Sequence, residues 1–221
     1  MNNKPLLLDC FSGAGGAAMG YYQAGFEVIG VDIKPQKNYP FRFIRADALE
    51  FIRLCGHWFD VIHASPPCQR YSRTKSIHNR KTWGNKNYPM LLESVRELLQ
   101  RSGKPYIIEN VEDAPLINPI TLCGSMFTGL RVYRHRLFET NPPIYWPPMM
   151  CNHSYSMPAS KGAYHTLANQ DFITCVGHNF KASDGRIAMG IDWMTRDELA
   201  ESIPPKYTRW IGEQLMNQIG F

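Results

Sequence analysis

The first 140 residues alternate short apolar runs with amphipathic segments, and this alternation constrains the fold more than any other feature of the sequence. Strands are predicted at the apolar runs 6–8, 27–33, 59–63, 106–109 and 131–139. Helices are predicted at 15–24, 47–54 and 89–101. Strands and helices in steady succession predict an α/β fold, with a mostly parallel, doubly wound sheet that helices cover on both faces.

A change of composition marks an insert in this pattern. Residues 141–189 are rich in Pro, Asn, Ser, His and Gly and show little periodicity, which predicts an irregular module. Regular structure returns with the capping box of Thr195 and Glu198. A four-residue apolar spacing then predicts a last helix through Tyr207, Ile211, Leu215 and Ile219. In 221 residues we expect one main domain, formed by 1–140 and 190–221, with a small insert.

The N-terminal apolar run is too short for a secretory signal or a membrane span, because only three leucines precede Asp9. The uncharged stretch 140–160 contains five prolines and cannot form an unbroken membrane helix. A cytoplasmic location is expected. In that compartment the six cysteines are expected to be free thiols, metal ligands or a nucleophile rather than a disulfide framework.

The net charge of +5 is concentrated in one stretch of the chain. The segment 69–92 has no Asp or Glu, and its basic residues are Arg70, Arg73, Lys75, Arg80, Lys81 and Lys86. The rest of the chain holds 18 basic and 19 acidic residues, so the whole positive excess lies in this segment. A polyanionic partner is predicted.

A glycine-rich turn follows the first predicted strand. Its residues Gly13, Ala14, Gly15, Gly16, Ala17 and Ala18 fit the pattern Gly-x-Gly-x-x-Gly/Ala, and Asp32 lies 19 residues after Gly13. Such a turn admits a nicotinamide dinucleotide or S-adenosylmethionine, whose ribose Asp32 would bind. Asp9 favours S-adenosylmethionine, because a carboxylate there repels a pyrophosphate and attracts a sulfonium. The alternative is that Asp9 is only an acid near a helix N-terminus.

The motif Ala64-Ser65-Pro66-Pro67-Cys68-Gln69 directly follows the predicted strand 59–63. Ligands of doubly wound sheets bind at the carboxyl ends of strands, and two prolines restrict the backbone before this thiol. The basic segment that follows would stabilise its thiolate. We therefore interpret Cys68 as a nucleophile, although a random cysteine is more often buried and inert.

Glu109 and the pair Arg134 and Arg136 stand at two further strand ends. Glu109 is either a catalytic acid or the partner of a local arginine. The two arginines are spaced by two, so on a strand they share one face and could together bind a base or phosphates, or line a solvated face. A thiolate that adds to C6 of a cytosine, with an acid at N3, makes C5 nucleophilic enough to take an activated methyl group.

These motifs, in this order, resemble the cytosine-C5 DNA methyltransferase family, and the chain looks like a compact, phage-type member. The matching residues run from Asp9-Cys10-Phe11-Ser12-Gly13-Ala14-Gly15-Gly16 through Asp32-Ile33, Asp47, Pro66-Pro67-Cys68-Gln69 and Glu109-Asn110-Val111 to Arg134-x-Arg136. The resemblance covers residues 5–140 and 190–221. It implies the Rossmann-like S-adenosylmethionine-dependent methyltransferase fold.

The resemblance also implies roles for individual residues. Cys68 would be the nucleophile and Glu109 the acid at N3, while Arg134 and Arg136 would contact the flipped cytosine and the thiolate region. The cofactor would lie against Asp9, Phe11, Ser12, Gly13, Ala14, Gly15, Gly16, Ile33 and Pro66, with its ribose on Asp32 and its adenine amino group on Asp47. The family has Gln at Val132, and its C-terminal Gly-Asn corresponds to Gly212-Glu213, so the contact to the methionine end of the cofactor stays unassigned.

Double-stranded DNA is the expected partner, and its target base must leave the helix to reach Cys68. Besides the six cations, Gln69 and Ser72 are expected to contact DNA, and Tyr71 and Trp83 offer aromatic faces for bases. The insert would recognise a short target of about two to four base pairs, because each specified pair needs its own side chain. The same chemistry on RNA or a free nucleotide, a nicotinamide-dependent oxidoreductase and a catalytically silent DNA-binding protein remain alternatives.

Two Cys/His pairs in the insert form a weaker candidate for a metal site. Cys151 with His153, and Cys175 with His178, would supply the four ligands of a tetrahedral zinc. Such a metal would stabilise a module too small to bury its own core. Polar loop residues and half-buried thiols are the favoured interpretation, because the first spacing is tighter than that of common zinc pairs.

Overall fold

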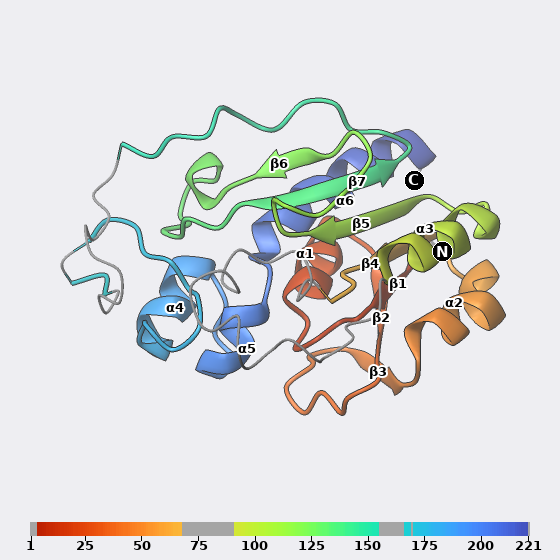
Figure 1. Ribbon diagram of the computed structural model, residues 1–221, viewed down its shortest axis with the longest axis horizontal. Coiled ribbons are helices and arrows are strands. Elements are labelled where there is room, and N and C mark those ends of the chain that lie inside the picture. Colours follow the sequence, from red (N-terminus) through yellow and green to blue (C-terminus); the bar gives the residue numbers. More distant parts are fainter. Residues whose placement is uncertain (1–3, 68–90, 155–165, 169, 221) are drawn as a thin grey trace, which may run out of the picture.

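The computed structural model describes residues 4–67, 91–154, 166–168 and 170–220 and contains a seven-stranded sheet flanked by helices (Figure 1). The sheet has the strand order β3-β2-β1-β4-β5-β7-β6. The strands are β1 Leu6–Cys10, β2 Glu27–Asp32, β3 Arg42–Arg45, β4 Val61–Ala64, β5 Tyr106–Asn110, β6 Ile120–Leu122 and β7 Arg136–Asn141. The helices are α1 Gly16–Ala24, α2 Ala48–Cys55, α3 Leu91–Ser102, α4 Ala182–Met189, α5 Arg196–Glu201 and α6 Pro205–Ile219. The predicted α/β class with a mostly parallel sheet is confirmed.

The sheet winds in two directions from its centre. From β1 the chain adds β2 and β3 on one side and β4 and β5 on the other, all parallel. The order therefore reverses between β1 and β4, and in doubly wound folds ligands bind at the carboxyl ends of the strands at such a point. β7 pairs antiparallel with β5, and β6 antiparallel with β7. The candidate site is expected beside the ends of β1, β4 and β5.

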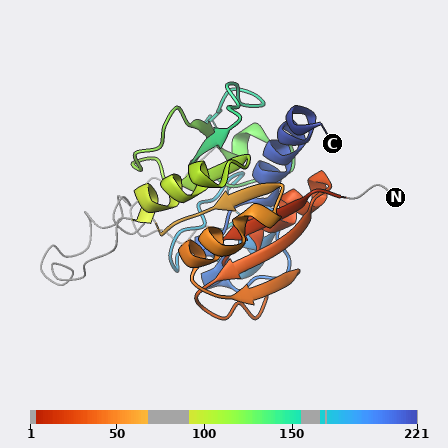
Figure 2. The same cartoon turned by 90° about the vertical axis from the view of Figure 1, so that its right-hand side faces the viewer.

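Adjacent residues of the parallel strands serve opposite faces of the sheet, as the two-residue period of a strand requires. Leu7 packs with the side chains of α1 and α6, whereas Leu8 packs with those of α2 and α3. Both side chains are fully buried. The same division holds for Ile107 and Ile108 in β5. Figure 2 shows the two pairs of helices on opposite sides of the sheet.

Glycines allow α1 to lie directly against the C-terminal part of the chain. A Cβ added at Gly16 would stand 2.0 Å from Ser202 Oγ, and one at Gly20 would stand 2.0 Å from Thr208 Oγ1. Thr208 Oγ1 also donates to the carbonyl of Ala17 at 2.8 Å. This close approach holds α6 against α1, so the last helix completes the core formed by the first part of the chain.

Four secondary-structure elements differ from the sequence prediction. β3 and β6 were not predicted, because they are only four and three residues long and lie at the two edges of the sheet. β7 begins at Arg136 rather than 131, since Val132 instead makes an isolated bridge with Ile173 of the insert. α4 lies within the segment predicted to be irregular.

The insert shares a core with the rest of the chain. Ile173 and Phe180 are buried together with Ala14 of the glycine turn and with Met194 and Leu199 near α5. Residues 173–180 of the insert thus pack against the glycine turn and against the segment that follows the insert. No helix in the described parts is long and apolar enough to cross a membrane.

Candidate active site

The loop between β1 and α1 has a backbone that favours glycine. Gly13 and Gly15 have φ values of 49° and 83°, and Phe11 also has a positive φ of 56°. A Cβ at Gly15 would lie 2.7 Å from Pro40 Cδ, so both the conformation and the space call for glycine. A Cβ at Gly13 would meet nothing within 4 Å, so the backbone there faces open space. A ligand can therefore approach the loop at Gly13.

Asp32 at the end of β2 is bound to this loop. Its Oδ2 accepts a hydrogen bond from the Gly13 N–H at 3.1 Å, and its Oδ1 accepts one from the Lys34 N–H at 2.9 Å. The neighbouring Ile33 is 62% exposed. The structure thus brings Gly13, Asp32 and an exposed apolar side chain together, as a nucleoside site requires.

Further features of this edge fit a bound cofactor. Among the described residues, Ser12 Oγ is buried and has no hydrogen-bond partner, so a polar group of a ligand would satisfy it. Trp193 Nε1 donates to the carbonyl of Ala14 at 2.9 Å and holds the loop from the C-terminal side. Gly16 packs against Ser202 instead of facing the loop. Asp47 is exposed and caps α2 by accepting from the Glu50 N–H at 3.0 Å.

Asp9 lies deeper than the sequence suggests. Its side chain is 1% exposed, and its Oδ2 accepts a hydrogen bond from Tyr39 Oη at 3.2 Å. Burial raises the pKa of Asp9 well above its usual value, against the lowering effect of Tyr39. The Asp9 carboxyl group thus lies inside the protein, and its contact with the cofactor stays a prediction.

His63 of β4, which no sequence pattern indicated, lies beside Asp9 in a buried polar network. Its Nδ1 is 2.9 Å from Tyr21 Oη and its Nε2 is 2.9 Å from Ser65 Oγ. Burial lowers the pKa of His63 to about 3, so the ring is neutral at physiological pH. A fully buried histidine in a strand gives no pattern signal, because the strand is identified from its apolar neighbours.

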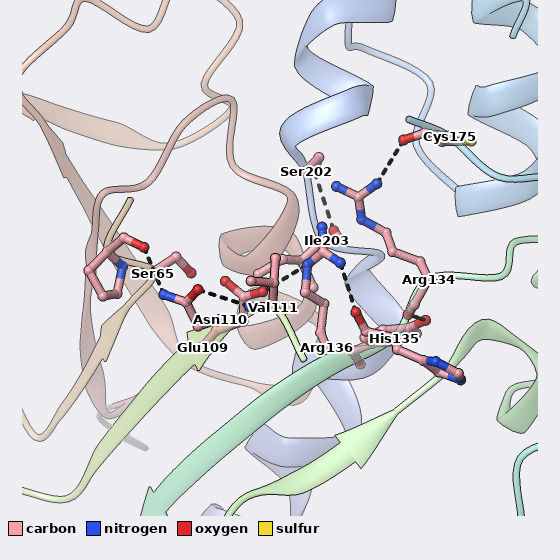
Figure 3. A network of polar contacts seen from close by, with 12 residues as sticks. Ser65, Glu109, Asn110, Val111, Arg134, His135, Arg136, Cys175, Ser202 and Ile203 are labelled. Atoms are coloured by element: carbon pink, nitrogen blue, oxygen red, sulfur yellow. Dashed lines mark hydrogen bonds and ion pairs between the residues drawn. The ribbon is translucent and has the colours of Figure 1, made fainter. Parts of the chain in front are cut away.

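Glu109 and Arg136 face each other at the ends of β5 and β7 (Figure 3). Arg136 Nε lies 3.1 Å from Glu109 Oε1, and Glu109 is only 6% exposed. Burial raises the pKa of Glu109, while the positive charge of Arg136 and a hydrogen bond from Ser65 lower it. A carboxyl group whose pKa is raised by burial can hold a proton and donate it, which is the property of a general acid.

Arg134 does not share the environment of Arg136, contrary to the sequence expectation. Its Nη1 donates to the carbonyl of Cys175 at 2.8 Å and its Nη2 to the carbonyl of Ala200 at 2.7 Å. Burial lowers the pKa of Arg134 to about 9. The prediction placed both arginines on one face of a strand, but residues 133–135 are not in a strand, so Arg134 points toward Cys175 (Figure 3).

A hydrogen bond connects β5 to the chain that leads to Cys68. Asn110 Nδ2 donates to the carbonyl of Pro66 at 3.0 Å, and Asn110 Oδ1 accepts from the Val111 N–H at 2.9 Å. Pro66 is two residues before Cys68, and Asn110 directly follows Glu109. Cys68 lies outside the described residues, as do the predicted DNA contacts Gln69, Arg70, Ser72, Arg73, Lys75, Arg80, Lys81 and Lys86.

The C-terminal segment that reaches the glycine turn is Ser202–Ile203. These residues stand where a Cβ on Gly16 would be. Gly212 instead packs against Ala24, and the exposed Glu213 pairs with Arg209 at 2.8 Å. Gly212 and Glu213 thus lie beside the end of α1 and not beside the glycine turn.

The sheet order and its flanking helices define the Rossmann-like fold of S-adenosylmethionine-dependent methyltransferases. Residues 6–115 match the family model described as C-5 cytosine-specific DNA methylase. The chain belongs to this family, as the order of its motifs indicates.

Solved structures share the fold over the whole chain. A candidate DNA modification methyltransferase encoded within an Escherichia coli prophage aligns with a TM-score of 0.64 and 14% identity, covering 99% of this chain and 100% of that one. The Dnmt2 methyltransferase of Schizosaccharomyces pombe aligns with a TM-score of 0.61 and 13% identity, with the same coverage. At this identity the alignments show a common fold.

Curated relatives are longer than this chain. The type II methyltransferase M.FnuDI of Fusobacterium nucleatum is 31% identical over 113 residues, which are 48% of this chain and 32% of the relative. The type II methyltransferase M.XorII of Xanthomonas oryzae pv. oryzae is 25% identical over 151 residues, 61% of this chain and 31% of the relative. The chain thus matches about a third of the length of these relatives.

Proposed function

We propose that this chain is a DNA (cytosine-5-)-methyltransferase that transfers a methyl group from S-adenosylmethionine to C5 of a flipped-out cytosine. The observation that carries the proposal is Glu109: a carboxyl group with a raised pKa, buried at a strand end and next to the residue that binds the chain two residues before Cys68. Family membership supports the same chemistry.

The residues around the glycine turn would hold the cofactor. Gly13 offers open backbone, Ser12 a buried hydroxyl group without a partner in the described chain, and Asp32 a carboxylate for the ribose. Ile33 is exposed where an adenine ring can pack against it. When bound, S-adenosylmethionine supplies the activated methyl group.

The reaction that we propose divides the work among three side chains. The Cys68 thiolate adds to C6 of cytosine, and Glu109 gives its proton to N3 as the C5–C6 double bond opens toward C5. Arg136, paired with Glu109, orients the carboxyl group. After C5 gains the methyl group, its proton passes to water, the C6–S bond breaks to release the thiolate, the C5–C6 double bond re-forms and N3 returns its proton to Glu109.

The substrate and the setting of the enzyme are also part of the proposal. We propose double-stranded DNA as substrate, with residues 141–189 recognising the target and the segment 69–86 contacting the backbone. The type II names of the relatives and the prophage neighbour suggest a role in restriction-modification or in phage DNA modification. Nothing in the comparisons favours the oxidoreductase alternative.

A covalent trap tests the proposal. A duplex that carries fluorine at cytosine C5 blocks the final proton loss, so protein, DNA and methyl group should stay joined through denaturing electrophoresis. Cys68→Ala should lose the adduct and still bind S-adenosylmethionine, because its binding residues lie at 11–16 and 32–33. Cys55→Ala, which changes a half-buried thiol away from the site, should keep the adduct.

Two further measurements test the substrate and the nucleophile. Methyl transfer to matched single-stranded RNA or to free cytidine nucleotides, with none to duplex DNA, would show that RNA or a free nucleotide is the substrate. Adduct formation by the Cys68→Ala protein would contradict the assignment of the nucleophile.

A further inference from the structure

Two cysteines and two histidines converge where β6 ends and β7 begins, at the edge of the sheet. Their sulfur and nitrogen atoms all lie within 4.8 Å of one another, and the four residues are Cys123, His135, Cys151 and His153. Cys123 follows β6, His135 precedes β7, and the other two lie 10 and 12 residues beyond the end of β7. Three segments distant in sequence thus place four metal-binding side chains in one cluster.

The separations of these atoms suit a tetrahedral metal. Zn²⁺ bound to two thiolates and two imidazoles holds its ligand atoms about 3.3 to 3.8 Å apart, given bonds of about 2.3 Å to sulfur and 2.0 to 2.1 Å to nitrogen. In the structure Cys151 Sγ is 3.3 Å from His135 Nε2 and 3.0 Å from His153 Nε2. Cys123 Sγ is 3.4 Å from His153 Nε2. Small movements would complete the geometry.

A carboxylate orients one of the histidines. His135 Nδ1 lies 3.0 Å from Glu112 Oε1, so a proton on Nδ1 donates to the carboxylate and leaves the lone pair of Nε2 facing the sulfur atoms. Histidine ligands of zinc commonly donate their second ring nitrogen in this way. The rings of His135 and His153 also stack, with centroids 4.8 Å apart and planes at 16°.

We propose that Cys123, His135, Cys151 and His153 bind a structural zinc ion that fastens the start of the insert to the edge of the sheet. Four protein ligands fill the coordination sphere, which is typical of structural rather than catalytic zinc. The proposal replaces the pairing suggested by the sequence, in which Cys175 and His178 supplied two ligands.

Cys175 and His178, the other pair predicted from the sequence, make their contacts outside the cluster. Cys175 is buried in the core around Ile173 and Phe180, and the exposed His178 lies 3.4 Å from Asp197. Sequence spacing suggested this pair because it lies in the same insert. The tertiary fold instead brings Cys123 and His135 from the sheet.

A bound metal would stabilise the position of the segment 142–154. It has four prolines and no helix or strand, and several large apolar side chains remain exposed, namely Tyr145, Trp146, Met149 and Met150. Apart from Ile144, burial therefore contributes little to holding it in place. A zinc ion that joins Cys151 and His153 to His135 would also fix the chain on either side of His135, which includes Arg136.

Metal content is the first test. Full-length protein purified from zinc-supplied cells without a chelator should contain one zinc per chain. Cys151→Ser and His153→Ala, which change exposed ligands, should lose it. Cys55→Ser and His178→Ala change a cysteine and a histidine outside the cluster and should keep it. Glu112→Gln should bind zinc about 10- to 100-fold more weakly, because it removes only the orienting carboxylate.

A cobalt spectrum tests the ligand set. Co²⁺ in the zinc-free protein should give thiolate charge-transfer and tetrahedral d–d bands, and Cys151→Ser should reduce the charge-transfer band while near-UV circular dichroism shows a folded protein. The proposal would be overturned if wild-type protein, purified without a chelator from zinc-supplied cells, contained no zinc and had Cys123 and Cys151 joined in a disulfide. Full zinc content in both Cys151→Ser and His153→Ala would overturn it as well. Neither result depends on methyltransferase activity.

Discussion

Burial shifts the pKa values of the ionisable residues at the candidate site. Glu109 has its pKa raised by burial, and His63 has its pKa lowered to about 3 by the same cause. Burial disfavours the charged form of each group, so the acid retains its proton more readily and the base loses its proton more readily. At this edge of the sheet both groups are therefore biased toward neutrality.

Glu109→Gln should slow methyl transfer strongly and leave DNA binding nearly unchanged. The amide keeps the size of the side chain but cannot donate a proton as an acid, and general acid catalysis contributes about 100- to 10,000-fold. Single-turnover rates and DNA affinity would separate the two effects. Glu93→Gln, an exposed carboxylate on α3, serves as the control. A mutant rate within a few-fold of wild type would remove Glu109 from the chemical step.

The pH profile of the rate should depend on Arg136. Glu109 acts as an acid only while protonated, so the rate should fall as pH rises through its pKa. The charge of Arg136 lowers that pKa, so Arg136→Gln should move the alkaline limb to higher pH even if the maximum rate drops. A limb that does not move would mean that it reports another group.

His63 should make the protein less stable in acid. Its pKa is about 3 in the folded state and near 6.5 when unfolded, so its contribution is complete above pH 6.5 and is lost as pH falls toward 3. Within this window each pH unit changes the free energy of unfolding by up to about 1.4 kcal/mol. The raised pKa of Asp9 has the opposite effect on stability at low pH. Asp9 is present in both the wild type and the His63→Gln variant, so a comparison of the two isolates the effect of His63.

Urea denaturation of the wild type and of His63→Gln between pH 4 and 7 would measure this effect. Stability of the wild type should fall more steeply toward low pH than that of the variant. Parallel curves would show that the imidazole is not the group that titrates.

At the scale of elements, a buried ion pair joins α3 to β7. Arg96 Nε donates to Glu139 Oε1 at 3.0 Å and Arg96 Nη2 donates to Glu139 Oε2 at 2.9 Å. The Ile117 N–H also donates to Glu139 at 2.9 Å, and Arg96 Nη2 to the carbonyl of Pro115 at 3.0 Å. The pair is thus well supplied with hydrogen bonds and fixes the helix that follows the basic segment.

Arg96→Ala should lower the free energy of unfolding by about 3 to 5 kcal/mol, because it leaves the Glu139 carboxylate buried without its partner. Arg101→Ala removes an exposed arginine that pairs loosely with Glu97 on the same helix. It should cost less than about 1 kcal/mol. Chemical denaturation of both variants would measure the difference, and equal losses would contradict the importance of the buried pair.

At the scale of the whole molecule, the charge distribution predicts how DNA binds. Charge reversal at Arg73, Lys75, Arg80 and Lys81 should weaken binding to all sequences alike. The slope of log affinity against log salt should become shallower by roughly 0.9 for each DNA phosphate that no longer pairs with a cation of the protein. Fluorescence anisotropy with specific and unrelated duplexes at several salt concentrations would measure both effects.

The matched control reverses four exposed cations elsewhere on the chain, Lys4, Arg53, Arg101 and Arg209. These changes alter the net charge equally but lie outside the basic segment. An equal drop in salt dependence in both sets would mean that net charge, and not the segment 69–92, determines the affinity.

The sequence by itself determined the class of fold and the order of the motifs. Its apolar runs have the length of buried strands, and the glycine turn and Asp32 stand at the distances that a doubly wound sheet requires. These signals are local, so they can be recognised without knowing which segments meet. The short edge strands β3 and β6 were missed, because three or four residues carry too little pattern.

Only the tertiary structure decided which side chains meet. It paired Arg136 with Glu109 while Arg134 turned to the carbonyl groups of Cys175 and Ala200. It also placed Cys123 and His135 beside Cys151, although they are 28 and 16 residues away in sequence. Contacts of this kind depend on where a strand begins and which edge of the sheet it joins, and these are set by packing over the whole chain rather than by local residue preferences.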